Sequence, residues 1–190
     1  DKGNLREAHE FLKKATQIDD KCIRALLSLI DVHLKNNEAG KATSLLKKLI
    51  KSNPQFIELF IRPAREIYLK RGSAQQYQSF LINQYASTPH NTVAIELLDS
   101  YKSCDQQEAL VKFLHQAIQN SATFELFDFA FKYYQSRPEI FNRDWPVLLS
   151  QFPSIKPRCI AFICNSCGYE SQTMQWNCPS CNTWSSLKPV

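Results

Sequence analysis

The chain has 190 residues, of which 44% are hydrophobic, 22% charged and 12% aromatic, and its formal net charge is +5. This composition is that of a folded globular protein and excludes an intrinsically disordered chain. Four glycines are too few for a Gly-lined nucleotide loop or for a β-rich chain with many tight turns, so we expect a mostly α-helical protein.

The basic surplus lies within residues 1–51, where lysines occur singly or in pairs at helical spacing. Such spacing is typical of solvated helix faces, so no nucleic-acid partner is expected. No stretch approaches the roughly 18–20 consecutive apolar residues of a membrane span, and the N-terminus lacks the layout of a signal peptide.

An internal repeat of about 34 residues begins the chain. A small, a large and an apolar position recur 34 residues apart, first as Ala8, Leu12 and Ala15 and then as Ala42, Leu46 and Leu49. This spacing resembles the second helix of a tetratricopeptide repeat. The segment before Ala42 fits the first helix of such a repeat, with Leu26, Leu29, Ile30 and His33 at the family's large, apolar, small and aromatic positions.

Two further helix pairs and a final amphipathic helix are predicted downstream. The residues that fit the repeat positions are Ile61, Ala64 and Tyr68; Tyr77, Leu81 and Gln84; Ala94, Leu97, Leu98 and Tyr101; Leu110, Leu114 and Ala117; and finally Phe124, Phe127, Phe131 and Tyr134. Pro63 falls inside one of these patterns and predicts either a bend or a helix boundary there. Three glycines, Gly3, Gly40 and Gly72, are predicted at turns between helices.

Stacked helix pairs of this kind form a curved solenoid with a concave groove that holds a peptide or a partner protein. The resemblance implies that seven residues line the groove: Arg24, Leu27, Asp31, Arg62, Glu66, Ile95 and Asp99. Because Gly3 directly precedes a second-helix pattern, the chain is expected to begin inside a repeat, with further repeats before it in the natural protein.

The texture of the sequence changes after the helical part. Residues 153–158 contain two prolines and two basic residues and predict a linker. We therefore expect a helical-repeat domain over residues 1–152 and a small second domain over residues 159–190.

The second domain carries four cysteines as two Cys-x2-Cys pairs separated by ten residues: Cys164 with Cys167, and Cys178 with Cys181. Two facing pairs form a tetrahedral thiolate pocket for one metal ion, and zinc and iron both accept such a shell. Gly168 suits a turn with positive φ, and the segment from Tyr169 to Trp176 is expected to form a short hairpin over the metal.

Other chemistries have less support in the sequence. Disulfides require an oxidising compartment, and a redox Cys-x2-Cys site needs only one pair in a βαβ context. A closed shell of four thiolates leaves no open position for catalytic water. No Gly-x-Ser-x-Gly, phosphate-binding loop or His-Glu-x-x-His motif is present, so an enzyme is not expected.

The C-terminal motifs carry a more specific resemblance. Cys164-x2-Cys167-Gly168-Tyr169, then the run from Trp176 through Cys178-Pro179-Ser180-Cys181, then the run from Trp184 to Pro189, follow the helical repeats. Together these features resemble the lipopolysaccharide assembly protein B family of Gram-negative bacteria, which combines an N-terminal membrane anchor, tetratricopeptide repeats and a rubredoxin-type metal domain.

The resemblance implies a non-catalytic adaptor at the cytoplasmic side of the bacterial inner membrane. Its implied role is to regulate lipopolysaccharide synthesis by helping the FtsH protease degrade the LpxC deacetylase, with the inner-membrane protein PbgA (YejM) opposing it. Lipopolysaccharide itself is a candidate ligand. A membrane anchor is expected N-terminal to this chain, which would itself be soluble.

Two alternatives remain open at the level of sequence. The chain could be a generic tetratricopeptide scaffold with a structural zinc ribbon, or a rubredoxin-like electron carrier that contains iron. We also hypothesise that the metal domain packs against the last repeats through Phe162, Trp176 and Trp184, and that Trp176 and Trp184 contribute to partner binding. The competing role for these rings is to cover the metal site.

Overall fold

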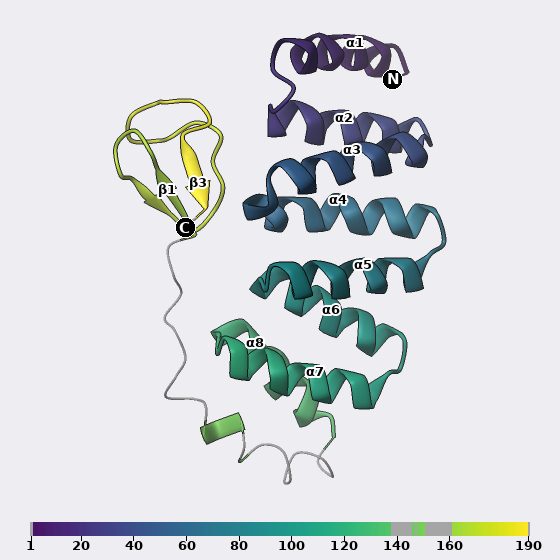
Figure 1. Cartoon of the computed structure of the whole chain (residues 1–190), viewed down its shortest axis with the longest axis vertical. Helices are drawn as coiled ribbons and strands as arrows, with labels where there is room; N and C mark the ends of the chain where they lie inside the picture. Colours follow the sequence, from purple (N-terminus) through teal and green to yellow (C-terminus); the bar gives the residue numbers. More distant parts are fainter. Residues whose placement is uncertain (1, 138–145, 147, 151–160, 190) are drawn as a thin grey trace. The chain divides into compact units, whose positions relative to one another are not determined.

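The computed structural model describes residues 2–137, 146, 148–150 and 161–189 (Figure 1). Its described elements are α1 (Lys2–Ile18), α2 (Ile23–Lys35), α3 (Ala39–Ser52), the 3₁₀ turn η1 (Pro54–Phe56), α4 (Ile57–Lys70), α5 (Ala74–Ser87), α6 (Asn91–Ser103), α7 (Gln107–Asn120), α8 (Phe124–Gln135), β1 (Phe162–Cys164), β2 (Glu170–Ser171) and β3 (Leu187–Pro189). The predicted class, helical repeats followed by a small four-cysteine ribbon, is confirmed.

The chain forms two compact units, the first ending at Gln107 and the second beginning at Glu108. The predicted linker 153–158, together with the predicted boundaries at 152 and 159, lies outside the described residues. Within the part that the structure describes, no helix is long and apolar enough to cross a membrane.

The repeat is visible in the backbone as well as in the sequence. At the ends of α1, α3, α5 and α7, which are the second helices of the repeats, a backbone N–H donates to the carbonyl four residues earlier. These donors recur every 33 to 35 residues: Asp19, Asn53, Thr88 and Ser121. The acceptors are the carbonyls of Ala15, Leu49, Gln84 and Ala117. Three of these four acceptors, all but Gln84, are small or apolar residues that the sequence pattern placed at the helix ends.

Most of the apolar positions of the pattern form the core, but the prediction is wrong for Phe124 and Phe131 of α8, which are 65% and 45% exposed. Ala42, Leu46 and Leu49 of α3 are at most 2% exposed, and Ala64 and Leu97 are equally buried in α4 and α6. In the first unit α2 contacts α4 and α4 contacts α6, so the first helices of successive pairs lie side by side and form one wall. Helix formation and burial therefore share one cause, the 3.6-residue apolar period.

Pro63 lies inside α4, which runs from Ile57 to Lys70. A helix boundary at Pro63 is therefore wrong, because the helix begins six residues earlier, after η1. Since proline has no N–H, the carbonyl of Leu59 cannot receive the usual bond from residue i+4. Packing of the buried face of α4 keeps the helix continuous in spite of that lost bond.

The glycine predictions are confirmed at one helix turn and wrong at two. Gly72 has φ +64° and lies in the turn between α4 and α5, as predicted. Gly3 lies within the first turn of α1 and Gly40 within the first turn of α3. Both helices begin before these glycines, because a helix tolerates glycine in its first turn, where few backbone bonds depend on it.

The ribbon is a three-stranded antiparallel sheet in the order β2-β1-β3, with Phe162 opposite both Ser171 and Pro189. The predicted hairpin within residues 169–176 is wrong. β2 pairs instead with β1 across the first cysteine turn, and an isolated bridge between Asn177 and Trp184 closes the second turn.

Candidate metal centre and groove

The first cysteine pair is carried by a turn that leaves β1. The N–H of Cys164 donates to the carbonyl of Tyr169 at 2.9 Å, and the N–H of Gly168 donates to the carbonyl of Cys164 at 2.9 Å. Gly168 takes φ +75°, a conformation that residues with a Cβ rarely adopt. The turn therefore folds back on itself and directs the Cys164 and Cys167 thiols to one side.

The second pair repeats this turn fourteen residues later. Cys178 exchanges the equivalent two bonds, donating to the carbonyl of Thr183 at 3.1 Å and accepting from the N–H of Asn182 at 2.8 Å. Asn182 has φ +56° and takes the place of Gly168. Asparagine tolerates this left-handed conformation better than most residues, which explains why the second turn forms without a glycine.

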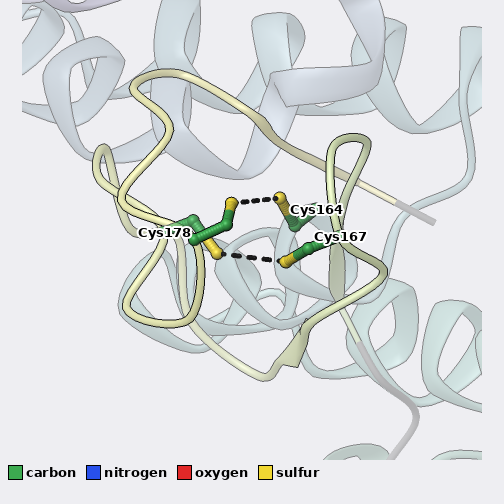
Figure 2. A group of neighbouring side chains, drawn as sticks. Cys164, Cys167 and Cys178 are labelled. Carbon is green, nitrogen blue, oxygen red and sulfur yellow. Dashed lines mark hydrogen bonds between the residues drawn. The ribbon is translucent and has the colours of Figure 1, made fainter.

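The two turns bring all four thiols together, and their ligand atoms lie within 4.8 Å of one another (Figure 2). Contacts of 3.7 Å join Cys164 Sγ to Cys181 Sγ and Cys167 Sγ to Cys178 Sγ. Four sulfurs placed tetrahedrally at about 2.3 Å from a metal lie about 3.8 Å apart. A disulfide would require about 2.05 Å. The geometry therefore fits one tetrahedral metal ion and not two disulfides.

Two of the sulfurs each lie within hydrogen-bonding distance of one hydroxyl group. Cys164 Sγ lies 3.1 Å from Ser186 Oγ, and Cys181 Sγ lies 3.2 Å from Thr183 Oγ1. Hydrogen bonding with Ser186 lowers the pKa of Cys164 to about 6, and hydrogen bonding with Thr183 lowers the pKa of Cys181. Both contacts favour the thiolate, which is the form that binds a metal.

Cys167 behaves in the opposite way. The backbone N–H of Tyr169 lowers the pKa of the Cys167 thiol, but burial and hydrogen bonds from the other three cysteines outweigh it and raise this pKa to about 11. Four crowded thiols cannot all ionise without a cation between them. A divalent ion removes that repulsion, so the thiolate set requires a metal to be fully charged.

The sulfurs also form part of the small ribbon core. Cys164 and Cys178 are buried together with Phe162 and Leu187. Partly buried neighbours complete this cluster: Ala161, Tyr169, Met174 and Cys181. Phe162 therefore packs inside the ribbon, whereas Trp176 is half-buried and Trp184 is 59% exposed.

A second concave site lies between α2 and α4 of the first unit. The cleft has a volume of about 480 Å³ and includes four of the seven predicted groove residues, Leu27, Asp31, Arg62 and Glu66. The other three, Arg24, Ile95 and Asp99, do not line this cleft. They lie on α2 and α6, where Arg24 and Asp99 are exposed and Ile95 is half-buried.

The cleft also contains residues that the sequence reading missed, above all Lys35 and Lys70. Each lies one helical turn beyond a predicted residue, Lys35 after Asp31 and Lys70 after Glu66. Extending the same i, i+4 stripe by one turn would have found both. The Lys70 ammonium donates to the carbonyl of Leu34 and so ties the end of α4 to α2.

Charges of both signs meet in this cleft. Burial raises the pKa of Asp31, and the Glu66 carboxylate raises it further, while Lys35 and Arg62 lower it. Arg62 Nε lies 3.4 Å from Glu66 Oε1, and the Arg62 side chain is 90% exposed. The cleft can therefore accept a polypeptide through polar side-chain contacts along one turn of each helix.

Comparison with known proteins agrees with both parts of the chain. Residues 162–189 match the family described as a rubredoxin metal binding domain, and residues 1–60 match the tetratricopeptide repeat family. The two matches coincide with the cysteine ribbon and with the first helices of the repeat.

Curated relatives cover nearly the whole chain. Lipopolysaccharide assembly protein B of Haemophilus influenzae is 25% identical over 187 residues, which cover 97% of this chain and 47% of the relative. The protein of the same name from Escherichia coli K12 is 23% identical over 195 residues, which cover 98% of this chain and 49% of the relative. The resemblance to this family is thus confirmed, and the chain spans about half the length of these relatives.

Proposed function

We propose that this chain acts in lipopolysaccharide assembly as a non-catalytic adaptor that binds partner proteins through its helical repeats. The observation that carries the proposal is the similarity to lipopolysaccharide assembly protein B across 97–98% of the chain, including the cysteine ribbon. The α2–α4 cleft supports it, because a mixed-charge wall of repeat helices suits polypeptide binding.

The finer proposal concerns the partners. We propose that the repeats present the LpxC deacetylase to the FtsH protease at the cytoplasmic side of the inner membrane, and that PbgA (YejM) opposes this step. Leu27, Asp31, Arg62 and Glu66 would contact a partner directly in the cleft. Arg24, Ile95 and Asp99 would extend the same surface, and Trp176 and Trp184 would add contacts from the ribbon.

The metal has a structural role in this proposal. Cys164, Cys167, Cys178 and Cys181 would hold one ion, zinc or iron, in a closed shell. When bound, the ion joins the two cysteine turns and neutralises the thiolates. Metal analysis and a visible spectrum of the purified protein distinguish zinc from iron, and a reversible iron redox cycle would favour the electron-carrier alternative.

The groove is tested with the intact protein in its own bacterium. We expect the double variant Arg24→Ala with Arg62→Ala to lower affinity for LpxC by up to about thirtyfold, because two exposed ion pairs contribute up to about 1 kcal/mol each. LpxC should then persist longer after translation is stopped, as followed by immunoblotting. Lys13→Ala, an exposed change on α1, is the matched control.

The ribbon is tested separately. Cys164→Ser with Cys167→Ser should abolish metal binding and slow LpxC turnover. Unchanged LpxC turnover in both the cysteine and the groove variants, with the proteins present at normal levels, would contradict the proposed function.

A further inference from the structure

A second cleft lies in the first unit, between α3 and α5, and it does not share residues with the α2–α4 cleft. Its volume is about 750 Å³, larger than the 480 Å³ of the α2–α4 cleft. One wall is α3 and the other is α5, with Tyr68 of α4 between them. The second helices of two successive repeats therefore enclose a space that the proposed adaptor function does not use.

The α5 wall has an unusual composition. None of its fourteen residues is charged, whereas each of the other labelled α-helices, α1 to α4 and α6 to α8, carries charged residues. Gln75, Gln76, Ser79 and Asn83 are exposed on it, and Ile82 is 42% exposed. A solvent-facing helix without charge, rich in amide, hydroxyl and tyrosine groups, resembles the centre of a protein interface, where charged residues are depleted.

The floor of the cleft is fixed by aromatic packing. The Tyr68 ring lies 5.6 Å from the Phe80 ring and 5.8 Å from the Tyr77 ring, measured between centroids. Tyr77 Oη in turn donates to Glu96 Oε2 at 2.9 Å, which holds α5 on α6. The α5 wall is therefore held in place by contacts on its other side, and the side-chain amides of Gln75 and Gln76 form no hydrogen bond with another described residue.

The α3 wall is positively charged. Lys47 and Lys51 lie one helical turn apart and are both exposed, and no ion pair joins either of them to another described residue. Arg71 adds a third cation beside the cleft, with its Nη1 3.4 Å from Thr43 Oγ1. None of the residues that line the cleft is acidic. The positive charge at this cleft is therefore uncompensated by the lining residues.

We propose that the α3–α5 cleft is a second docking site, which binds an acidic polypeptide segment of a partner protein. Carboxylates of the segment would meet Lys47 and Lys51, and its backbone would meet the amides of Gln75 and Gln76. Nucleic acid fits less well, because three cations neutralise few phosphates compared with the roughly six to ten contacts of a DNA-binding protein. The site does not depend on the proposed role in lipopolysaccharide assembly.

The test uses the purified 190-residue chain and a fluorescein-labelled, capped peptide in which glutamates recur at i, i+4 spacing between Gln and Leu residues. A peptide of the same length with lysine in place of glutamate is the charge control. We expect saturable binding of the acidic peptide alone at physiological salt, measured by anisotropy, with amide shifts in NMR spectra confined to residues of α3 to α5.

Charge variants locate the site. Lys47→Glu with Lys51→Glu should weaken binding at least tenfold, and so should Gln75→Glu with Gln76→Glu, which keeps good helix formers in α5. Lys13→Glu with Lys14→Glu makes the same charge change on α1 and should leave affinity within about twofold, since exposed distant charges are screened. Far-UV circular dichroism checks that each variant is folded.

Three results would overturn the proposal. The first is an absence of saturable binding of the acidic peptide. The second is equal weakening by the α1 control and the α3 variant, which would indicate only a general charge effect. The third is tighter binding of a single-stranded oligonucleotide or of phosphatidylglycerol vesicles at the same residues, which would assign the cleft to another class of ligand.

Discussion

Individual hydroxyl side chains tune the four-cysteine site. Ser186 Oγ lies 3.1 Å from Cys164 Sγ and 2.9 Å from the carbonyl oxygen of Thr183, so one side chain links Cys164 to the second cysteine turn. Ser186 is 7% exposed. Loss of a buried group that orients a metal ligand in this way typically lowers metal affinity by about ten- to a hundredfold.

The first prediction concerns this serine. Ser186→Ala should lower metal affinity about tenfold, as loss of an outer contact to a metal ligand typically does. Hydrogen bonding with Ser186 lowers the pKa of Cys164 from the ordinary 9.0 to about 6, so without it protons compete better for the sulfur. Metal should therefore be released at a higher pH in the variant, as followed by a zinc-sensitive dye during acid titration.

The lowered pKa of Cys164 determines how the stability of the ribbon depends on pH. The contribution of the Cys164 thiolate to the folded ribbon is complete above pH 9 and is lost as the pH falls through about 6. Ser180→Ala, an exposed change within the second cysteine turn, serves as control. Metal release at a lower pH in Ser186→Ala, or the same shift in both variants, would refute the assigned role of Ser186.

At the scale of elements, the turns between the two helices of each pair share one backbone conformation, although a different residue occupies the same position in each turn. Asn37, Gly72 and Asp105 all have positive φ, between 53° and 64°. In each turn the residue itself donates to the carbonyl three positions back, and the next residue donates to the carbonyl five positions back. This left-handed ending satisfies carbonyls that the helix leaves free.

The second prediction compares a glycine with positive φ, Gly72, with a glycine inside a helix, Gly40. Gly72→Ala should lower the free energy of unfolding by about 1 kcal/mol, because alanine is strained at φ +64° although no atom lies within 4 Å of the new Cβ. Gly40→Ala should raise it by about 0.5–1 kcal/mol, because Gly40 lies in the first turn of α3 and the space around it is equally open.

Urea denaturation followed by circular dichroism measures both changes under one set of conditions. Each variant is the control for the other, since the side chain added is identical and only the backbone conformation differs. Destabilisation by Gly40→Ala of the same size as that by Gly72→Ala would contradict the conformational explanation.

At the scale of the whole molecule, two different forces hold the described parts together. The helices bury long apolar side chains, among them Phe60, Leu81 and Leu114, with essentially no exposure. The buried core of the ribbon consists of Phe162, Leu187 and two cysteines. A core of that size does not offset the conformational entropy of about 30 residues without a further link, so the ribbon is expected to depend on its metal.

The third prediction is that chelation separates these two parts. Excess 1,10-phenanthroline should abolish the dispersed NMR signals of residues 161–189, because the bound form of the ribbon is its folded form. The far-UV helical signal should persist, since the helices derive their stability from apolar packing. A parallel loss of the helical signal, or a ribbon that stays dispersed without metal, would contradict this division.

The apolar period and the cysteine spacing were sufficient to predict the helices, the repeat and the four-cysteine cluster, because both are local properties of the chain. The period of 34 residues reappears in the backbone bonds of Asp19 and Asn53. Two Cys-x2-Cys pairs at this spacing are typical of a metal site, so it could be predicted without a structure that the four sulfurs come together.

Other features could not be predicted because neither the apolar period nor the cysteine spacing encodes them. Asn37 and Asp105 replace glycine in two turns, and only the pairing of their backbone bonds reveals the equivalence. Pro63 remains inside α4 because buried neighbours compensate for its missing N–H. β2 pairs with β1 and not within 169–176, since the sheet register is set across the cysteine turn.

Sequence alone thus determined most of the residues that are buried in helices and the four sulfurs that come together. Only the tertiary structure decided which surface residues share a cleft, because that depends on how one helix lies against the next. It divided the predicted groove residues between those that line the α2–α4 cleft and those that do not, and it brought the lysines of α3 opposite the uncharged wall of α5.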